Sequence, residues 1–374
     1  MHIGTWENWK IRISAVLWFV LGLGFLLSLP IIFGWAAWAF IIVLVVATLL
    51  ALPTAWLIGR FASRDRRASF IGRWLKAELV WLFVLSILVA GPIYYLASVT
   101  EFRPAVVPQA TLTDGKKTVV FQGMMHVGSE NFYKSVIYDL EKALSEGYVL
   151  YYESVQTATP ESKEFFAKFT KALTGRGGDL SANYKMMAQT CGLKFQSDYF
   201  GLLEADKKVN PERHVIADVD AIDMKREYER LMQSDPAFAK AHANDFKSQP
   251  HAEPLDAPLM QGAVEWLNSE TTSRKSLMGV VCRGYMTMAL TANEEKEPGP
   301  FEPIVLDFRN RELAKRIVDD SHDKIFITYG SRHLSGVLDL LVKQNPAWHV
   351  ASLKWIRTIE VPKRQLTGKL ASTQ

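Results

Sequence analysis

The chain has 374 residues, of which 49% are hydrophobic and 22% are charged. It is longer than one average domain and more apolar than a fully soluble protein usually is. The net charge of +4 is small, and no basic stripe with stacking aromatic residues is present, so no nucleic-acid partner is expected. The two cysteines, Cys191 and Cys282, match no metal-ligand spacing, and their number leaves open whether they are free or joined in one disulfide.

Two stretches near the N-terminus contain no charged residue and are long enough to cross a bilayer. They run from Ile13 to Gly59 and from Leu79 to Thr100. Because a membrane-spanning helix needs about 20 apolar residues, the first stretch predicts two helices and the second predicts one. We expect a turn at 33–35 between the first two helices. The predicted spans are 13–33, 35–58 and 79–99, within an anchor that covers residues 1–100.

Basic residues gather on one side of these predicted spans. They are Lys10 and Arg12 before the first span, and Arg60, Arg64, Arg66, Arg67, Arg73 and Lys76 between the second and third. The positive-inside rule places such short basic segments in the cytoplasm. We therefore expect an integral protein of the bacterial inner or plasma membrane. Its N-terminus would be cytoplasmic, its C-terminal domain extracytoplasmic, and the lipid bilayer would be its first partner.

The remainder of the chain alternates strand and helix patterns. Residues 101–116, which contain two prolines, are expected to form a linker, residues 117–362 an α/β domain, and residues 363–374 a polar tail. Parallel strands need crossover helices, so the alternation predicts a mainly parallel central sheet. Helices within Leu259–Asn293 are expected to cap this sheet.

One short unit occurs twice in this domain and gives the clearest functional signal. A strand-length apolar run leads to Gly123, two residues and His126, and a second such run leads to Gly330, two residues and His333. Apolar residues three and four positions apart follow each His and predict a helix. Open α/β sheets bind ligands at the carboxyl ends of their strands. Although one such motif is usually structural, its repetition predicts two histidines that face one crevice.

Carboxylates end two further predicted strands. Glu153 follows the apolar run 148–152, and Asp218 and Asp220 end the run that begins at His214. A carboxylate at the end of a buried strand must be paired or bind a ligand unless it turns to solvent, because burying an unpaired charge is costly. Asp220 could equally be the N-cap of the helix that starts at the next residue.

Arg309 and Asn310 fall in the first turn of a predicted helix. A cation gains nothing from the partial positive charge of a helix N-terminus, which indicates that Arg309 is held there for another purpose. A surface salt bridge is the simpler alternative.

These features together resemble the TraB/PrgY–Tiki superfamily, which is related to the GumN and erythromycin-esterase-like proteins. The residues that carry the resemblance are Gly123, His126, Glu153, Arg309, Asn310, Gly330, His333, Leu334 and Gly336. The family places paired Gly-x-x-His motifs, a Glu and an Arg-Asn pair in one pocket, and its Tiki members are regarded as membrane-tethered, metal-dependent proteases. The likeness covers about residues 117–342, with the middle third poorly matched. Because the Tiki anchor is C-terminal, substrate and topology are not transferred.

The resemblance and the residue types predict a membrane-anchored metal-dependent hydrolase, with a peptidase that cuts an extracytoplasmic peptide or protein as the first expectation. His126, His333 and Glu153 would bind one divalent ion (Mn, Co, Zn or Fe), with Asp218 or, as the alternative, Asp220 as a further ligand. A water on the metal would attack the substrate carbonyl. Glu153 could instead be the general base, and Arg309 and Asn310 would stabilise the oxyanion or orient the acid.

The alternative is a non-catalytic membrane protein that binds a peptide, a signal molecule or haem in the same pocket, since function must be argued from the site itself. The sequence contains neither a nucleophile elbow nor a His-Glu-x-x-His helix, so an ordinary serine hydrolase or a zincin is not expected. Loss of turnover without loss of binding in Glu153→Gln would favour the enzyme.

Overall fold

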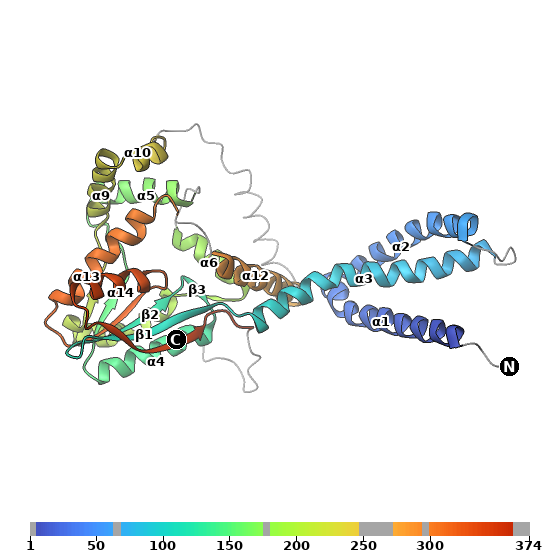
Figure 1. Cartoon of the computed structure of the whole chain (residues 1–374), viewed down its shortest axis with the longest axis horizontal. Coiled ribbons are helices and arrows are strands. Elements are labelled where there is room, and N and C mark those ends of the chain that lie inside the picture. Colours follow the sequence, from blue (N-terminus) through green and yellow to red (C-terminus); the bar gives the residue numbers. More distant parts are fainter. Residues whose placement is uncertain (1–4, 63–68, 175–179, 247–271, 294–298, 362–374) are drawn as a thin grey trace. The chain divides into compact units, whose positions relative to one another are not determined.

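The structure is a computed structural model that describes residues 5–62, 69–174, 180–246, 272–293 and 299–361 (Figure 1). The described residues fall into two compact units. The first contains the chain up to Val99 and the described part of Leu267–Tyr285, and the second contains the rest.

Three helices of the first unit are long and apolar enough to cross a membrane. They are α1 (Thr5–Trp35), α2 (Ala37–Leu57), which continues into the π-helical turn η1 (Ile58–Ala62), and α3 (Phe70–Phe102). Large apolar side chains are exposed along all three, as expected of helices whose surface is covered by lipid instead of protein. The prediction of three N-terminal helices that are long and apolar enough to span a membrane is confirmed.

The ends of these helices differ from the predicted ends. α1 continues through the expected turn at 33–35, and Ala36 is the extended residue that separates it from α2. α3 begins at Phe70 and not at 79, because Arg73 and Lys76 extend the helix beyond the apolar stretch without breaking it. Polar contacts join α2 to α3: Thr48 Oγ1 donates to Glu78 Oε1 at 2.9 Å.

A six-stranded sheet forms the centre of the second unit, with strand order β6-β4-β7-β2-β1-β8. The strands are β1 (Val106–Thr113), β2 (Thr118–Met124), β4 (Val149–Tyr152), β6 (His214–Ile216), β7 (Lys324–Gly330) and β8 (His349–Arg357). Neighbours among β6, β4, β7 and β2 pair in parallel, whereas β1 is antiparallel to both β2 and β8. The prediction of an α/β domain with a mainly parallel sheet is confirmed.

The strand β1 lies in the segment 101–116 that the sequence predicted to be a linker. Pro108 argued against a strand there, because proline cannot donate to a sheet ladder. The register resolves the conflict: pairing with β2 starts at Gln109, so Pro108 lies opposite Trp355 of β8 but beyond the end of the β2 ladder. The segment is therefore part of the sheet.

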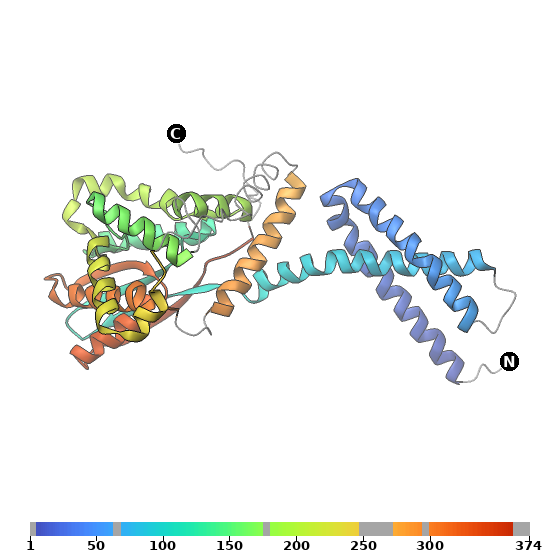
Figure 2. The same ribbon diagram turned by 90° about the horizontal axis from the view of Figure 1, so that it is seen from above.

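Helices cover both faces of this sheet (Figures 1 and 2). On one face, α4 (Glu130–Ser145) packs its buried stripe against β2, β4 and β7. On the other face lie α13 (Arg309–Asp319) and α14 (His333–Gln344). Ser129 caps the start of α4, and Gly147 adopts φ +84° just after the C-cap residue Glu146, where a glycine commonly ends a helix.

A second apolar core joins helices beyond the sheet. It contains side chains of α5 (Pro160–Thr174), α9 (Ala221–Ser234), α10 (Pro236–His242) and the π-helical η4 (Pro303–Phe308). The remaining elements are β3 (Val127–Gly128), α6 (Leu180–Cys191), β5 (Lys194–Phe195), α7 (Ser197–Phe200), η2 (Gly201–Leu203), α8 (Glu204–Val209), η3 (Pro211–Arg213) and α12 (Thr272–Asn293).

The predicted helical cap in Leu259–Asn293 is only partly described. Residues 259–271 lie outside the described ranges, as does the predicted polar tail 363–374. The residues of α12 up to Tyr285 cluster with the first unit. Cys191 and Cys282, whose state the sequence left open, are both disulfide-bonded.

Candidate functional site

The carboxyl ends of the parallel strands bring most of the predicted residues to one cavity, but of the two predicted histidines only His126 lines it, and Asn310 does not line it either. His126 lies two residues after β2, Glu153 directly after β4 and Asp218 two residues after β6, while His333 is the first residue of the helix that follows β7. The cavity has a volume of ≈ 730 Å³. Its lining includes His126, Glu153, Asp218 and Arg309. The predicted residues are thus brought together at the edge of the sheet where open α/β folds bind ligands.

Arg309 connects two strand ends. Its Nε and Nη2 donate to the two oxygens of Asp218 at 2.9 and 2.6 Å, and Nη2 also donates to Glu153 Oε1 at 2.6 Å. Burial by itself would lower the pKa of Arg309, but the charge and hydrogen bonds of Asp218 outweigh it and raise that pKa. Arg309 is a buried ion-paired residue, so the surface salt bridge considered for it is wrong.

Asp218 is fully engaged by its neighbours. Besides Arg309, its Oδ1 accepts hydrogen bonds from the Tyr329 hydroxyl at 2.7 Å and from the Val219 N–H at 2.9 Å. Its side chain is 0% exposed. A buried carboxylate with this many donors is a fixed negative charge that holds Arg309 in place.

Glu153 is the carboxylate that remains open to the cavity. Its Oε1 faces Arg309, and its Oε2 accepts the Gly330 N–H at 2.5 Å. Its side chain is nevertheless 24% exposed. The carboxylate is fixed on one side and keeps lone pairs for a ligand on the other, because an ionised carboxylate offers about four acceptor positions.

His333 is held as a neutral ring behind Arg309. Its Nδ1 donates to Asn310 Oδ1 at 2.7 Å, since an amide oxygen can only accept, which leaves a lone pair on Nε2. That Nε2 lies 3.4 Å from Arg309 Nη1. Burial, followed by the charges of Arg309 and Arg332, lowers the pKa of His333 to about 3. Asn310 therefore orients His333 and does not face the cavity.

His126 is fixed by the small sheet that β3 forms with β5. Its Nδ1 accepts the side-chain amide N–H of Gln196 at 2.9 Å, and its ring stacks on Tyr184 with centroids 4.4 Å apart. The neutral ring therefore carries its proton on Nε2. Burial lowers the pKa of His126; the Glu153 charge opposes this shift, and the Arg309 charge adds to it. The cavity thus has a neutral N–H donor near an ionised carboxylate.

The arrangement does not fit the predicted divalent metal. Nη2 of Arg309 lies 2.6 Å from both Glu153 Oε1 and Asp218 Oδ2, so a guanidinium stands where an ion shared by these carboxylates would bind. Within the described ranges, no group of three or more His, Cys, Asp or Glu side chains is placed to share an ion. Asp220, the alternative ligand, caps α9 by accepting the Ile222 N–H at 2.8 Å.

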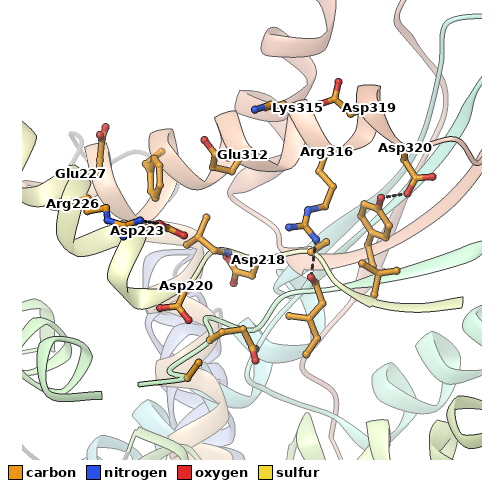
Figure 3. A pocket seen from close by; sticks show the side chains of 18 of the residues that line it. Asp218, Asp220, Asp223, Arg226, Glu227, Glu312, Lys315, Arg316, Asp319 and Asp320 are labelled. Carbon is orange, nitrogen blue, oxygen red and sulfur yellow. Dashed lines mark hydrogen bonds and ion pairs between the residues drawn. The ribbon is translucent and has the colours of Figure 1, made fainter. Parts of the chain in front are cut away.

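A larger cavity of ≈ 1180 Å³ lies between α9, α13 and the end of β6 (Figure 3). Its charged side chains are largely used within the fold. Arg226 pairs with Asp223 at 2.8 Å, Arg316 donates to the Ile216 carbonyl at 3.0 Å, and Tyr151 bonds to Asp320. None of the predicted histidines lines it. We therefore assign the functional site to the smaller cavity.

Three residues of the site were not predicted from the sequence. Tyr329 precedes the Gly330 motif directly, so its position at a buried strand end was a usable signal. Gln196 and Tyr184 belong to the poorly matched middle of the chain. The pairing of β3 with β5 brings Gln196 to His126, and Tyr184 reaches it from α6.

Comparison of the chain with protein-family models, with curated proteins and with solved structures finds no match. The family resemblance stays a prediction, and function has to be argued from the geometry of the site.

Proposed function

We propose that the protein is a membrane-anchored hydrolase that cleaves an acyl bond, with an extracytoplasmic peptide or protein as substrate, and that it is a member of the TraB/PrgY–Tiki superfamily. The observation that carries this proposal is the setting of Glu153. An ionised carboxylate, fixed by Arg309 and by the Gly330 N–H, faces a cavity that His126 also lines.

These two residues can perform general acid–base chemistry on a bound water. Glu153 accepts a proton from water as the oxygen attacks the carbonyl carbon, and His126 Nε2–H donates to the carbonyl oxygen as negative charge develops there. The C–N or C–O bond then breaks, and the leaving group takes the proton from Glu153. Arg309 and Asn310 act through Glu153 and His333, so we assign them positioning roles.

The charge of the site favours an internal peptide bond over a chain terminus. The inner cluster has one guanidinium and two carboxylates, with both histidines neutral. A substrate carboxylate would meet net negative charge there. An internal amide is neutral and avoids this repulsion, which supports an endopeptidase over a carboxypeptidase.

The extracytoplasmic location has support from two features. Basic residues precede the first span and lie in the loop between the second and third spans. The positive-inside rule places such segments in the cytoplasm. The disulfide-bonded state of both cysteines is typical of proteins in oxidising compartments outside the cytoplasm.

The test is turnover by the full chain in detergent, with fluorescence-quenched peptides and simple esters as substrates. Glu153→Gln keeps the shape of the side chain but removes the base, and should lower kcat by about 10²–10⁴-fold. Glu204→Gln is the matched control, because Glu204 lines the same cavity at its rim and is 54% exposed. Unchanged turnover in Glu153→Gln would overturn the proposal.

Metal dependence has its own measurement in the same experiment. We would measure the metal content of the purified chain and its turnover after treatment with a chelator. These two measurements distinguish water activation without a metal from the predicted metal-dependent mechanism. Turnover that survives chelation supports the acid–base pair. A stoichiometric divalent ion whose removal abolishes turnover would show that Arg309 moves aside and that the metal prediction was right.

Binding without catalysis is the second candidate, because aromatic side chains line the cavity. They are Tyr152, Phe166, Phe169, Tyr184, Phe195 and Phe200. Such a lining suits a peptide, a signal molecule or haem. Saturable binding of peptide or haem by a chain that hydrolyses none of the substrates would favour this reading.

A further inference from the structure

A second chain of hydrogen-bonded side chains borders the same cavity. The hydroxyl of Tyr152 lies 2.8 Å from His214 Nδ1, and His214 Nε2 lies 2.7 Å from Asp206 Oδ2. Both Tyr152 and His214 line the same cavity as Glu153. Tyr152 is the last residue of β4, His214 the first residue of β6, and Asp206 belongs to α8.

The partners fix the direction of each hydrogen bond. An ionised carboxylate can only accept, so Asp206 requires a proton on His214 Nε2. The Nδ1 lone pair of the neutral ring then accepts the Tyr152 hydroxyl. This is a hydroxyl that contacts a base, with the base oriented by a carboxylate, which is the arrangement that activates nucleophiles in acyl-transfer enzymes.

Neighbouring groups stabilise these proton positions, with Asp206 ionised and the Tyr152 hydroxyl protonated. The hydrogen bond from His214 lowers the pKa of Asp206, and the Asn210 side-chain amide donates to its other oxygen at 2.9 Å, so the carboxylate stays ionised. Burial, together with the charges of Asp206 and Glu204, raises the pKa of Tyr152. No phenolate is present in advance, and Tyr152 can react only if His214 takes its proton.

A purely structural network would not need two of its residues in the lining of a cavity, as Tyr152 and His214 are. The His214 side chain is 1% exposed, and its ring lies nearly parallel to that of Tyr152, with 10° between the planes and centroids 5.9 Å apart. The base is thus buried and rigid, while Tyr152 lines the cavity.

We propose that Tyr152 is the nucleophile of this cavity, with His214 as its base and Asp206 as the residue that orients the base. The Tyr152 oxygen forms a bond to the acyl carbon while its proton moves to His214 Nδ1. His214 then passes that proton to the leaving amine or alcohol as the C–N or C–O bond breaks. In this sequence the water activated by Glu153 attacks the carbonyl carbon of the acyl-tyrosine ester and not that of the original substrate, and the released Tyr152 oxygen recovers a proton from Glu153.

The choice of substrate bond rests on the proposed function, but the reactivity of the hydroxyl does not. An aryl sulfonyl fluoride reports that reactivity directly: the tyrosine oxygen displaces fluoride at sulfur while the base takes the proton. The full chain in detergent would be treated with this probe, and the adducts would be located and timed by peptide mass spectrometry.

Tyr152 should be modified about 100-fold faster than Tyr138, a surface tyrosine that is 67% exposed, in line with the lower range for general-base assistance. His214→Gln should remove most of this advantage. Asp206→Asn should remove part of the rate advantage of Tyr152. Because the Asp206 side chain is 33% exposed, this variant tests the Tyr152–His214–Asp206 relay without disturbing the core.

The outcomes distinguish the tyrosine nucleophile from the proposed hydrolase function. Modification of Tyr152 at the same rate in wild type, His214→Gln and Asp206→Asn would overturn the relay, as would full turnover in Tyr152→Phe. Hydrolysis without a reactive Tyr152 would leave the hydrolase standing and remove the nucleophile. If Tyr152 reacts with the probe in a His214-dependent way but the chain hydrolyses none of the substrates, the activated tyrosine stands and the proposed hydrolase function fails.

Discussion

Arg309 has five N–H donors, and the fold uses all of them. Two bonds go to Asp218, one to Glu153, and the remaining nitrogen lies 3.4 Å from both the Val305 carbonyl and His333 Nε2. No strong donor is left for a substrate oxyanion, which was one role considered for this residue. Its charge instead fixes the position of Glu153, and its removal would leave two carboxylates without their cation, a loss of about 3–5 kcal/mol for a buried pair.

The buried neutral state of His333 makes stability depend on pH. Well above pH 6.5 the imidazole is neutral in both folded and unfolded chains and contributes no slope. Below about pH 6.5 the unfolded chain binds a proton that the folded protein excludes until about pH 3. Stability should therefore fall with decreasing pH in this window, by up to about 1.4 kcal/mol per pH unit from this group.

His333→Asn removes the titrating ring, so this variant should lose less stability between pH 6.5 and pH 4.5 than wild type does. Melting temperatures across that range would show the difference in slope, whatever the starting stability of the variant. His126 contributes in the same direction, because its pKa is also lowered. Parallel slopes for wild type and His333→Asn would contradict the neutral state assigned to this histidine.

The two Gly-x-x-His motifs have different structural contexts. His333 begins α14 directly, as the sequence predicted. His126 instead leads into the two-residue strand β3, and α4 starts only at Glu130. The pairing of β3 with β5 gives His126 its Gln196 partner, whereas α13 gives His333 its Asn310 partner.

The contact between α13 and α14 depends on Gly336. A Cβ atom at this position would lie 2.2 Å from Asn310 Nδ2, far inside van der Waals contact. Gly336→Ala should therefore push the helices apart, destabilise the domain by about 1–3 kcal/mol and lower its melting temperature by roughly 2–10 °C. Gly201→Ala is the control, because nothing lies within 4 Å of the added Cβ and no loss is expected. Equal melting temperatures for the two variants would refute the packing argument.

On the scale of the whole molecule, three apolar helices precede an α/β unit, and the proposed function requires that unit to lie outside the cytoplasm. Alkaline phosphatase fused after Arg103 in a bacterial host should be active, because this enzyme folds only outside the cytoplasm. The same fusion after Arg64 should be inactive. The reversed pattern would place the domain in the cytoplasm and refute the proposed orientation.

The sequence by itself determined the features that depend on local pattern. Uncharged runs of sufficient length predicted three spans, β-branched runs followed by amphipathic stretches predicted the parallel strands and their helices, and strand ends predicted that His126, Glu153, Asp218 and His333 would meet. The tertiary structure decided what depends on non-local pairing. The register of β1 turned an expected linker into a strand, and the approach of Arg309 to Asp218 and Glu153 filled the expected metal position with a guanidinium.

The Tyr152–His214–Asp206 relay belongs to this second group. Its members lie on three separate elements, and no local spacing relates them. Sequence patterns record which residues end a strand or face a core, because both follow from periodicity along one segment. Contacts between side chains of different segments depend on sheet order and helix packing, so the chemistry of this cavity became visible only in the folded chain.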